Sequence, residues 1–386
     1  MKAVQFVHTL NYGDAISGEA IALKRLFEER GWEAKILALH AHEKVKHLAE
    51  IWHGTAQQRA ELESLRSDDL IFNHYSIASP LNDVFGELVG AKRALLYHNL
   101  TPPHWFADYN PRVHAALKQG ARELPALLAL SDVVLADSEY NRQELVELGC
   151  RDVRVLPLPL DRKKWDVPAN SGITRVLSGH GGVNVLHVGR LAPNKCVEDI
   201  IKAFYFYHHK IERNSRLWLV GIDIDTELYS FELRRLISKL QLREAVTFVG
   251  SVADSELRAF YENSDVYLCM SEHEGFCLPL LEAMYFKLPV IAFDACAVRG
   301  TLGDAGVLLT EKDPAVTAEL INLLAADSDL RRDYISRGTS RAELYFEERF
   351  AELVDSVLMR QRPHTMEKSD TKVDDESGRA KAQSWA

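Results

Sequence analysis

Short apolar runs alternate with amphipathic stretches through the first half of the chain. Residues 3–8 and 33–39 have the composition of buried strands, and residues 18–30 between them repeat apolar positions at helical spacing. Further apolar runs occupy residues 70–73, 93–97, 133–136 and 153–157. Continuous apolar runs are typical of parallel strands that helices cover on both faces. The pattern therefore predicts a doubly wound α/β domain over residues 1–165.

The same alternation restarts in the second half. Residues 160–182 are rich in Asp, Lys, Pro, Asn, Ser and Gly, which is linker composition and marks a domain boundary. Strand-like runs then occupy residues 183–188, 217–220, 246–249, 266–270 and 289–293. Helical patterns separate them, so we predict a second doubly wound, Rossmann-like domain over residues 175–345. Ligands of such sheets bind at the carboxyl ends of the strands.

The end of the sequence predicts two further features. A helical pattern over residues 341–360 predicts a helix that crosses back onto the first domain. Residues 361–386 are polar and offer almost nothing to bury, so we expect a disordered tail.

Composition and charge narrow the function classes. The 386 residues are 47% apolar and carry a formal net charge of -10, with both signs mixed, which argues against a general electrostatic grip on nucleic acid. The five cysteines are widely spread and odd in number, a pattern that suits a reducing cytoplasm and argues against a disulfide framework. No stretch approaches the roughly 20 apolar residues of a membrane-spanning helix.

The segment from Ser271 to Met284 carries the clearest chemistry. It follows a predicted strand, turns tightly and starts a helix in which Pro279 fits the first position, where its missing N–H costs nothing. A helix start aims backbone N–H groups and a positive dipole end at an anion such as a diphosphate. Glu274 in the loop and Glu282 one turn into the helix can accept hydrogen bonds from sugar or ribose hydroxyls.

On this segment the chain resembles the retaining glycosyltransferases of family 4, which share two glutamates separated by seven residues after a strand. The resemblance extends over roughly residues 1–360 and implies the GT-B fold, in which two doubly wound parallel-sheet domains face each other. It implies that Glu274 contacts the transferred sugar and Glu282 the nucleotide ribose. The implied donor-binding backbone comprises Gly275, Phe276, Cys277 and Leu278.

Three residues depart from the family's pattern. Cys277 and Cys196 stand where the family usually has glycine, and Lys287 stands where a small residue is common after the helix. These departures leave the donor preference open.

A second group of residues follows the strand at residues 183–188. Arg190 and Lys195 lie five residues apart in a loop that opens into a helix. Fixed positive charges stabilise a diphosphate leaving group, and the resemblance implies this role for both residues. The alternative is that both are solvated loop charges.

Two motifs of the first domain and one turn of the second are weaker candidates. Gly13 and Asp14 lie between the first strand and the first helix, where the resemblance implies contact with donor phosphates and the acceptor; an ordinary turn explains them nearly as well. His98 ends a strand, and we expect it to bind the transferred sugar unless it is a structural histidine. Gly250 resembles the family's base-binding loop or is a plain turn.

The sequence offers two patterns that imitate metal sites. Asp223 and Asp225 form an Asp-x-Asp pair, but it lies in a loop of the second domain rather than in the fold that uses such a pair. The histidines at positions 40, 42 and 47 lack the partners and spacing of a zinc site. We therefore expect no metal and no cofactor, with a nucleotide sugar as donor substrate.

The resemblance implies a retaining hexosyltransferase whose departing phosphate takes the proton of the acceptor hydroxyl. Bacterial envelope polysaccharide or a lipid-linked glycan is the implied acceptor, with peripheral contact at the inner face of the cytoplasmic membrane. Two alternatives remain open, namely a nucleotide-sugar 2-epimerase on the same fold and a non-catalytic nucleotide-sugar-binding protein. A dehydrogenase is disfavoured because neither domain has the full glycine fingerprint after its first strand. The base, the sugar and the oligomeric state are not predicted.

Overall fold

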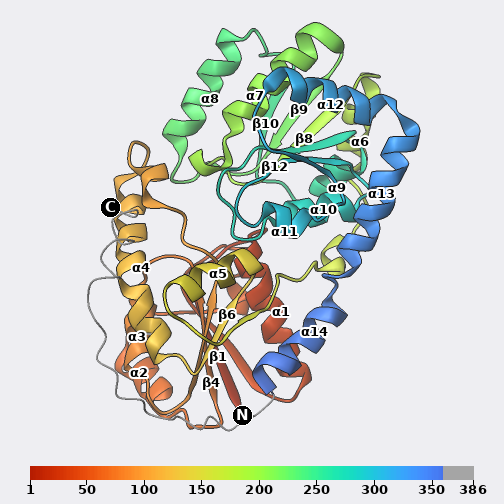
Figure 1. Cartoon of the computed structure of the whole chain (residues 1–386). Helices are drawn as coiled ribbons and strands as arrows, with labels where there is room; N and C mark the ends of the chain where they lie inside the picture. The colour runs from red at the N-terminus through yellow and green to blue at the C-terminus, as the bar shows by residue number, and fades with distance from the viewer. Residues whose placement is uncertain (360–386) are drawn as a thin grey trace. The chain divides into compact units, whose positions relative to one another are not determined.

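The computed structural model describes residues 1–359, which form two compact units (Figure 1). Of the described residues, unit 1 contains 1–137, 142–156 and 350–359, and unit 2 contains 138–141 and 157–349. The predicted tail at 361–386 lies outside the described residues.

Unit 1 is built on a parallel sheet in which seven strands are described, in the order β3-β2-β1-β4-β5-β6-β7. Its strands are β1 (Lys2–Leu10), β2 (Glu33–Ala41), β3 (Glu50–Ile51), β4 (Leu70–Tyr75), β5 (Lys92–Tyr97), β6 (Val133–Ala136) and β7 (Val153–Val155). The reversal of strand order between β1 and β4 places the carboxyl ends of these two strands at a switch point, where doubly wound sheets bind ligands.

Helices cover both faces of this sheet (Figure 1). They are α1 (Ala15–Glu29), α2 (Ala56–Glu63), α3 (Pro80–Glu87), α4 (Pro111–Leu130), α5 (Glu139–Glu147) and the end of α14 (Glu347–Val354), with short turns η1 (Lys46–Leu48), η2 (Pro103–Phe106) and η6 (Asp355–Met359). On one face, Phe27 of α1 and Val354 of α14 share a buried cluster with the strand residues Phe72 and Leu96. The last described helix thus completes the core of unit 1.

Unit 2 has a parallel sheet in which six strands are described, in the order β10-β9-β8-β11-β12-β13. They are β8 (Asn184–Val188), β9 (Arg216–Val220), β10 (Val246–Gly250), β11 (Val266–Cys269), β12 (Val290–Phe293) and β13 (Val307–Leu309). Strands β8 and β11 are neighbours, so the loops that follow them start at the same edge of the sheet. Both sheets agree with the predicted doubly wound α/β architecture.

The helices of unit 2 alternate with these strands. They are α6 (Ser171–Gly179), α7 (Val197–Phe206), α8 (Glu227–Lys239), α9 (Asp254–Glu262), α10 (Leu278–Tyr285), α11 (Val298–Leu302), α12 (Pro314–Ala326) and α13 (Ser328–Glu343), with short turns η3 (Arg162–Trp165), η4 (Pro193–Lys195) and η5 (Tyr207–Ile211). Helix α7 packs against α12, and α10 packs against α13.

The segment predicted as a linker is part of the folded unit 2. Helix α6 begins after Asn170, whose side chain accepts from the N–H groups of Gly172 and Ile173, and it packs against α9. Trp165 and Leu177 are buried. The Gly and Ser content concealed a short helix, which a polar N-cap, the buried Leu177 and packing against α9 hold in place.

The predicted continuous helix at the end of the chain is also interrupted. Helix α13 ends at Glu343, residues 344–346 are not helical, and α14 restarts at Glu347. Leu160 and Phe346 form an isolated parallel bridge at this interruption, and the N–H of Leu160 donates to the carbonyl of Tyr345. These bonds satisfy backbone groups of the non-helical segment.

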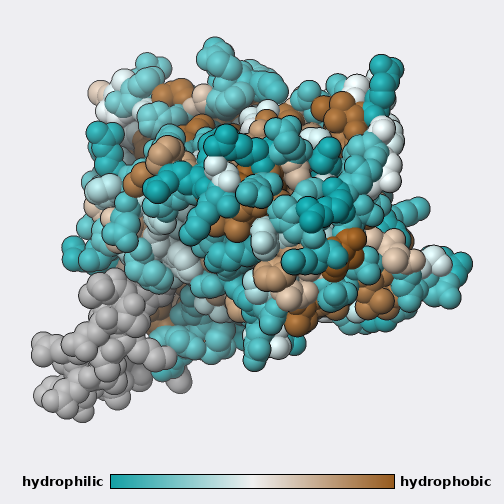
Figure 2. Space-filling view, turned by 90° about the horizontal axis from the view of Figure 1, so that it is seen from above, coloured by the Kyte–Doolittle hydropathy of each residue, from teal (hydrophilic) through white to brown (hydrophobic). Residues whose placement is uncertain are grey.

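The surface offers no large apolar area on the face that Figure 2 shows, where hydrophobic residues are scattered among hydrophilic ones. No helix within residues 1–359 combines the length and apolar composition that crossing a membrane requires.

Candidate functional site

The loop between β11 and α10 forms the predicted helix-start site. Cys277 is the N-cap in a left-handed conformation, Leu278 is the first helical residue, and Pro279 therefore occupies the second position rather than the predicted first. Gly275 and Leu278 are half-buried, whereas Phe276 and Cys277 are buried. First-turn N–H groups have no acceptor inside their own helix, so this turn can hold an anion.

Lys195 and Glu274 form a direct ion pair in unit 2. Lys195 ends η4 after β8, Glu274 lies in the loop after β11, and the Nζ to Oε2 distance is 2.6 Å. Burial by itself would raise the pKa of Glu274, but the charge of Lys195 and the hydrogen bonds to the carboxylate together hold the pKa below its ordinary value. Burial by itself would lower the pKa of Lys195, but the nearby groups, Glu274 first among them, raise the pKa above its ordinary value. Both groups are therefore charged at neutral pH.

Glu282 is held by two side chains that the sequence did not single out. Lys164 Nζ lies 2.8 Å from Oε1, and the Tyr261 hydroxyl donates to Oε2 at 2.8 Å. Burial, followed by the charge of Glu282, raises the pKa of Tyr261 well above its ordinary value, so the hydroxyl stays protonated. Glu282 is only 5% exposed. Its expected ribose contact therefore requires sharing an oxygen with one of these partners.

Arg190 is anchored to the loop that follows β9. Its Nη2 donates to the carbonyl of Ile224 at 2.8 Å. The loops after β8 and β9 approach so closely that a Cβ on Gly221 would lie 1.8 Å from the Gly189 carbonyl oxygen, which demands glycine at position 221. The structure thus joins Lys195 to Glu274 directly and ties Arg190, in the same loop as Lys195, to the loop after β9.

A buried histidine beneath this site was not predicted. His187 of β8 directs Nδ1 at the carbonyl of Leu268, 3.0 Å away. Burial above all lowers the pKa of His187 to about 4, with the nearby charge of Lys195 adding to the effect. Because the neutral ring donates from Nδ1, its Nε2 is an acceptor. The pattern of apolar residues in the strand carries no sign of such a histidine, which is why it was not predicted.

The three departures from the family pattern share one backbone conformation. Cys196, Cys277 and Lys287 have φ angles of 48°, 70° and 59°. This left-handed region is sterically costly for residues with a Cβ, which explains why glycine or a small residue is usual at such positions.

Gly250, the candidate base-binding residue, ends β10 with a φ of 79°. The pairing of β10 with β9 shifts register between Phe248 and Gly250, and the Gly250 carbonyl accepts from the N–H of Gly221. The residue therefore forms an irregular strand end beside the Arg190 loop.

In unit 1, Gly13 and Asp14 form the turn into α1. Gly13 has a φ of 78°, and Asp14 caps the helix by accepting from the N–H and the hydroxyl of Ser17 at 2.9 and 2.8 Å. Asp14 is exposed, so its N-cap role leaves oxygen lone pairs at the surface.

His98 differs from the expectation that its ring faces a sugar. Its side chain is 1% exposed, Nε2 lies 3.0 Å from His74 Nδ1, and Nδ1 lies 3.4 Å from Asp137 Oδ2. Both ring nitrogens are thus directed into unit 1. Glu19 lies beside them; burial, followed by the charge of Asp137, raises its pKa well above the ordinary value. Polar partners inside the domain explain why the ring turns inward.

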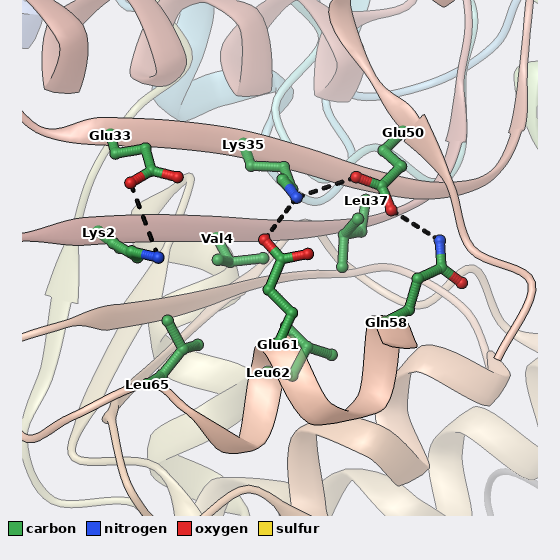
Figure 3. A pocket seen from close by; sticks show the side chains of 10 residues that line it. All are labelled: Lys2, Val4, Glu33, Lys35, Leu37, Glu50, Gln58, Glu61, Leu62 and Leu65. Carbon is green, nitrogen blue, oxygen red and sulfur yellow. Dashed lines mark hydrogen bonds and ion pairs between the residues drawn. The ribbon is translucent and has the colours of Figure 1, made fainter. Parts of the chain in front are cut away.

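A surface pocket of unit 1 lies apart from all predicted site residues (Figure 3). Lys35 bridges Glu50 and Glu61 across it at 2.9 and 2.6 Å, and Gln58 donates to Glu50. These charged groups already satisfy one another, so the pocket is not assigned a function.

Comparison with known proteins matches part of this chain to one family. The family described as glycosyl transferases group 1 matches residues 177–341, which contain Arg190, Lys195, Glu274 and Glu282. The GDP-mannose-dependent alpha-mannosyltransferase of Mycobacterium tuberculosis is 32% identical over 62% of this chain and 59% of its own length. The O-antigen chain mannosyltransferase B of Escherichia coli is 26% identical over 42% of this chain and 41% of its own length.

Solved structures extend the match to the whole fold. Anabaena HepE, solved with UDP and glucose, superposes with a TM-score of 0.76 at 18% identity, over 93% of this chain and 99% of HepE. This likeness shows a GT-B fold, with the two parallel-sheet α/β domains predicted from the sequence. The chain spans less than two thirds of the length of either curated relative. Residues 177–341 therefore match the group 1 glycosyl transferases in the part of the chain that contains both glutamates of the predicted signature.

Proposed function

We propose that this chain transfers a sugar from a nucleotide-diphosphate sugar to a hydroxyl group of a glycan or lipid-linked acceptor. The observation that carries the proposal is the pairing of Lys195 with Glu274 beside the start of α10. This arrangement puts a cation, an oriented carboxylate and a helix start together on adjoining loops of one sheet edge. A nucleoside diphosphate carrying a sugar presents the complementary anion and hydroxyl groups.

In the proposed reaction, the bond between the anomeric carbon and the diphosphate oxygen breaks while the acceptor oxygen bonds to that carbon. The departing phosphate oxygen takes the proton of the acceptor hydroxyl. Lys195 and Arg190 stabilise the negative charge that develops on the diphosphate. Their own fixed charges supply this stabilisation, so the proposal includes no metal at the diphosphate.

Donor binding rearranges the ion pair. Glu274 already balances the charge of Lys195, so an incoming diphosphate competes with the carboxylate for the ammonium group. A sugar hydroxyl can then donate a hydrogen bond to the carboxylate oxygen that Lys195 has left. The free protein thus stores both groups in charged, hydrogen-bonded form. This explains how a buried carboxylate and ammonium persist until the donor arrives.

The acceptor side is proposed from the relatives. The Escherichia coli relative is named for O-antigen chains, and another relative, from Xanthomonas oryzae, is named for a cellobiosyl-diphosphopolyprenol acceptor. We propose an envelope glycan or polyprenol-linked acceptor, with retention of anomeric configuration and action at the inner face of the cytoplasmic membrane.

A donor screen tests the proposal. Thermal unfolding is measured with UDP, GDP and ADP and their glucose and mannose derivatives, because relatives bind or are named for different nucleotides. One nucleotide is expected to raise the melting temperature of the wild type. The same nucleotide should raise the melting temperature of Glu282→Gln by less. Glu319→Gln, an exposed change on α12, is the matched control. A wild type that no nucleotide stabilises contradicts the proposal.

Turnover is then measured as nucleoside diphosphate release with and without acceptor lipid extracts. Arg190→Met is expected to lower kcat by on the order of 100-fold while donor binding persists, since its charge acts on the leaving group. Acceptor-independent conversion of the sugar identifies an epimerase instead. Binding without release under every acceptor identifies a non-catalytic protein.

A further inference from the structure

Three side chains from three elements of unit 1 converge on one buried point. Glu19 belongs to α1, His74 lies at the carboxyl end of β4, and His98 follows β5 directly. One ligand atom from each lies within 4.8 Å of the others, and all three residues are buried. His98 Nε2 is 3.0 Å from His74 Nδ1 and 3.5 Å from Glu19 Oε2.

The far nitrogens of both rings face oxygen atoms. His74 Nε2 lies 2.8 Å from Gln5 Oε1, and Gln5 Nε2 donates to the carbonyl of Ala20 at 2.9 Å, which fixes the amide orientation. His74 therefore carries its proton on Nε2 and turns the lone pair of Nδ1 toward the cluster. His98 Nδ1 faces the Asp137 carboxylate. Metal-binding histidines are oriented by such outer partners.

Glu19 supplies an unpaired carboxylate. Its side chain is 0% exposed, and neither Oε1 nor Oε2 has a hydrogen-bond partner among the described residues. A buried carboxylate without a hydrogen bond is strongly disfavoured unless a proton or a cation neutralises it. The two histidines that lie beside it are good ligands for such a cation.

We propose that Glu19, His74 and His98 bind a divalent transition-metal ion of the zinc class inside unit 1. Two imidazoles and one carboxylate match zinc, whereas magnesium and calcium favour oxygen ligands alone. Glu19 and the neighbouring Asp137 offset the charge of the ion. The site is separate from the donor-binding residues of unit 2 and does not depend on the proposed function.

Binding exchanges a proton for the ion. The two rings are nearly parallel, with an interplanar angle of 7°, and their facing nitrogens lie 3.0 Å apart, so in the metal-free protein one hydrogen bridges His98 Nε2 and His74 Nδ1. The ion takes both nitrogens after a small turn of the rings. The proton of His98 moves to Nδ1, which faces Asp137, and the carboxyl proton of Glu19 leaves to solvent. The ion then ties α1 to the ends of β4 and β5 and holds His98 inside the domain.

Metal analysis of the full-length protein tests this inference. Purified protein is stripped with a chelator, titrated with Zn²⁺ and examined by X-ray absorption. One Zn²⁺ per chain is expected, with nitrogen and oxygen ligands at about 2.0–2.1 Å. Glu19→Gln, which keeps side-chain size, should weaken Zn²⁺ binding by more than the roughly 10–100-fold that loss of an outer partner costs, as in Gln5→Leu.

His42→Gln is the matched control, because His42 is an exposed histidine of the same unit. It should leave the Zn²⁺ affinity unchanged. Co²⁺ binding to the wild type is a second measurement, and it does not depend on whether a variant folds. Co²⁺ at this site should show the visible absorption of an ion with nitrogen and oxygen ligands. A stripped wild type that takes up neither ion overturns the inference. Zn²⁺ binding that Glu19→Gln leaves intact also overturns it, because the ion is then held elsewhere.

Discussion

Replacing Lys287 by glycine should stabilise unit 2, although the change removes a whole side chain. Lys287 follows helix α10 with a φ of 59°. Its N–H donates to the carbonyl of Met284 at 3.0 Å, and the next N–H, of Leu288, donates to Ala283 at 2.9 Å. These two bonds form a Schellman motif, whose left-handed position normally holds glycine.

The expected gain follows from two opposing contributions. A side chain in the left-handed region costs roughly 1–2 kcal/mol. Glycine also makes the unfolded chain more flexible, which lowers the free energy of unfolding by about 0.5–1 kcal/mol and offsets part of the gain. Lys287 is exposed, so little packing is lost. Lys287→Gly should therefore raise the free energy of unfolding by about 0.5–1 kcal/mol and the melting temperature by about 1–4 °C.

Chemical denaturation and thermal unfolding measure this gain. Gln241, after helix α8, has a φ of 57° and the same pair of hydrogen bonds, so Gln241→Gly should also stabilise the protein. Lys239→Gly, an exposed change within the last turn of α8, should destabilise it by about 1 kcal/mol. If Lys287→Gly and Lys239→Gly shift stability in the same direction, the conformational reasoning is refuted.

Three further changes test individual contacts. Glu274 has a lowered pKa and Lys195 a raised one, so their pair should stabilise the protein fully between about pH 4.5 and 10.5. This stability should be lost as pH falls through the folded pKa of Glu274 or rises through the folded pKa of Lys195. The free energy of unfolding of Glu274→Gln, measured against pH, should therefore fall less steeply in acid than that of the wild type. Tyr261→Phe removes a hydrogen bond to the Glu282 carboxylate and should cost about 1.5–3 kcal/mol in denaturation, with an unchanged melt refuting the contact. Asn170→Ala removes the N-cap of α6 and should cost about 1 kcal/mol, unless the segment is the linker that its composition suggests.

The sequence predicts the sheets well because their strands are buried on both faces. Apolar runs such as residues 133–136 match strand β6 to the residue. The two-residue strand β3 and the short strand β13 were missed, since runs this short carry no periodic signal. Helix α6 was missed because its glycines and serines resemble a loop.

The candidate site was predictable where strand topology alone brings residues together. Lys195 and Glu274 are 79 residues apart, yet they follow neighbouring parallel strands, so their meeting is expected. Lys164 and Tyr261 reach Glu282 from η3 and α9. Such packing of helices and turns depends on side-chain fit that no local pattern encodes, which is why both partners were missed.

The family resemblance and the structure give His98 different roles. The family resemblance assigns its ring to the donor sugar, whereas the structure directs one nitrogen at His74 and the other at Asp137. An imidazole has only these two polar atoms, so a sugar contact requires at least one of them to turn away from its present neighbour. A bound zinc ion would make that rotation costlier. If the ring serves the sugar, stripping zinc should tighten donor binding; if it serves the domain's core, stripping zinc should lower the stability of unit 1 and leave donor affinity unchanged.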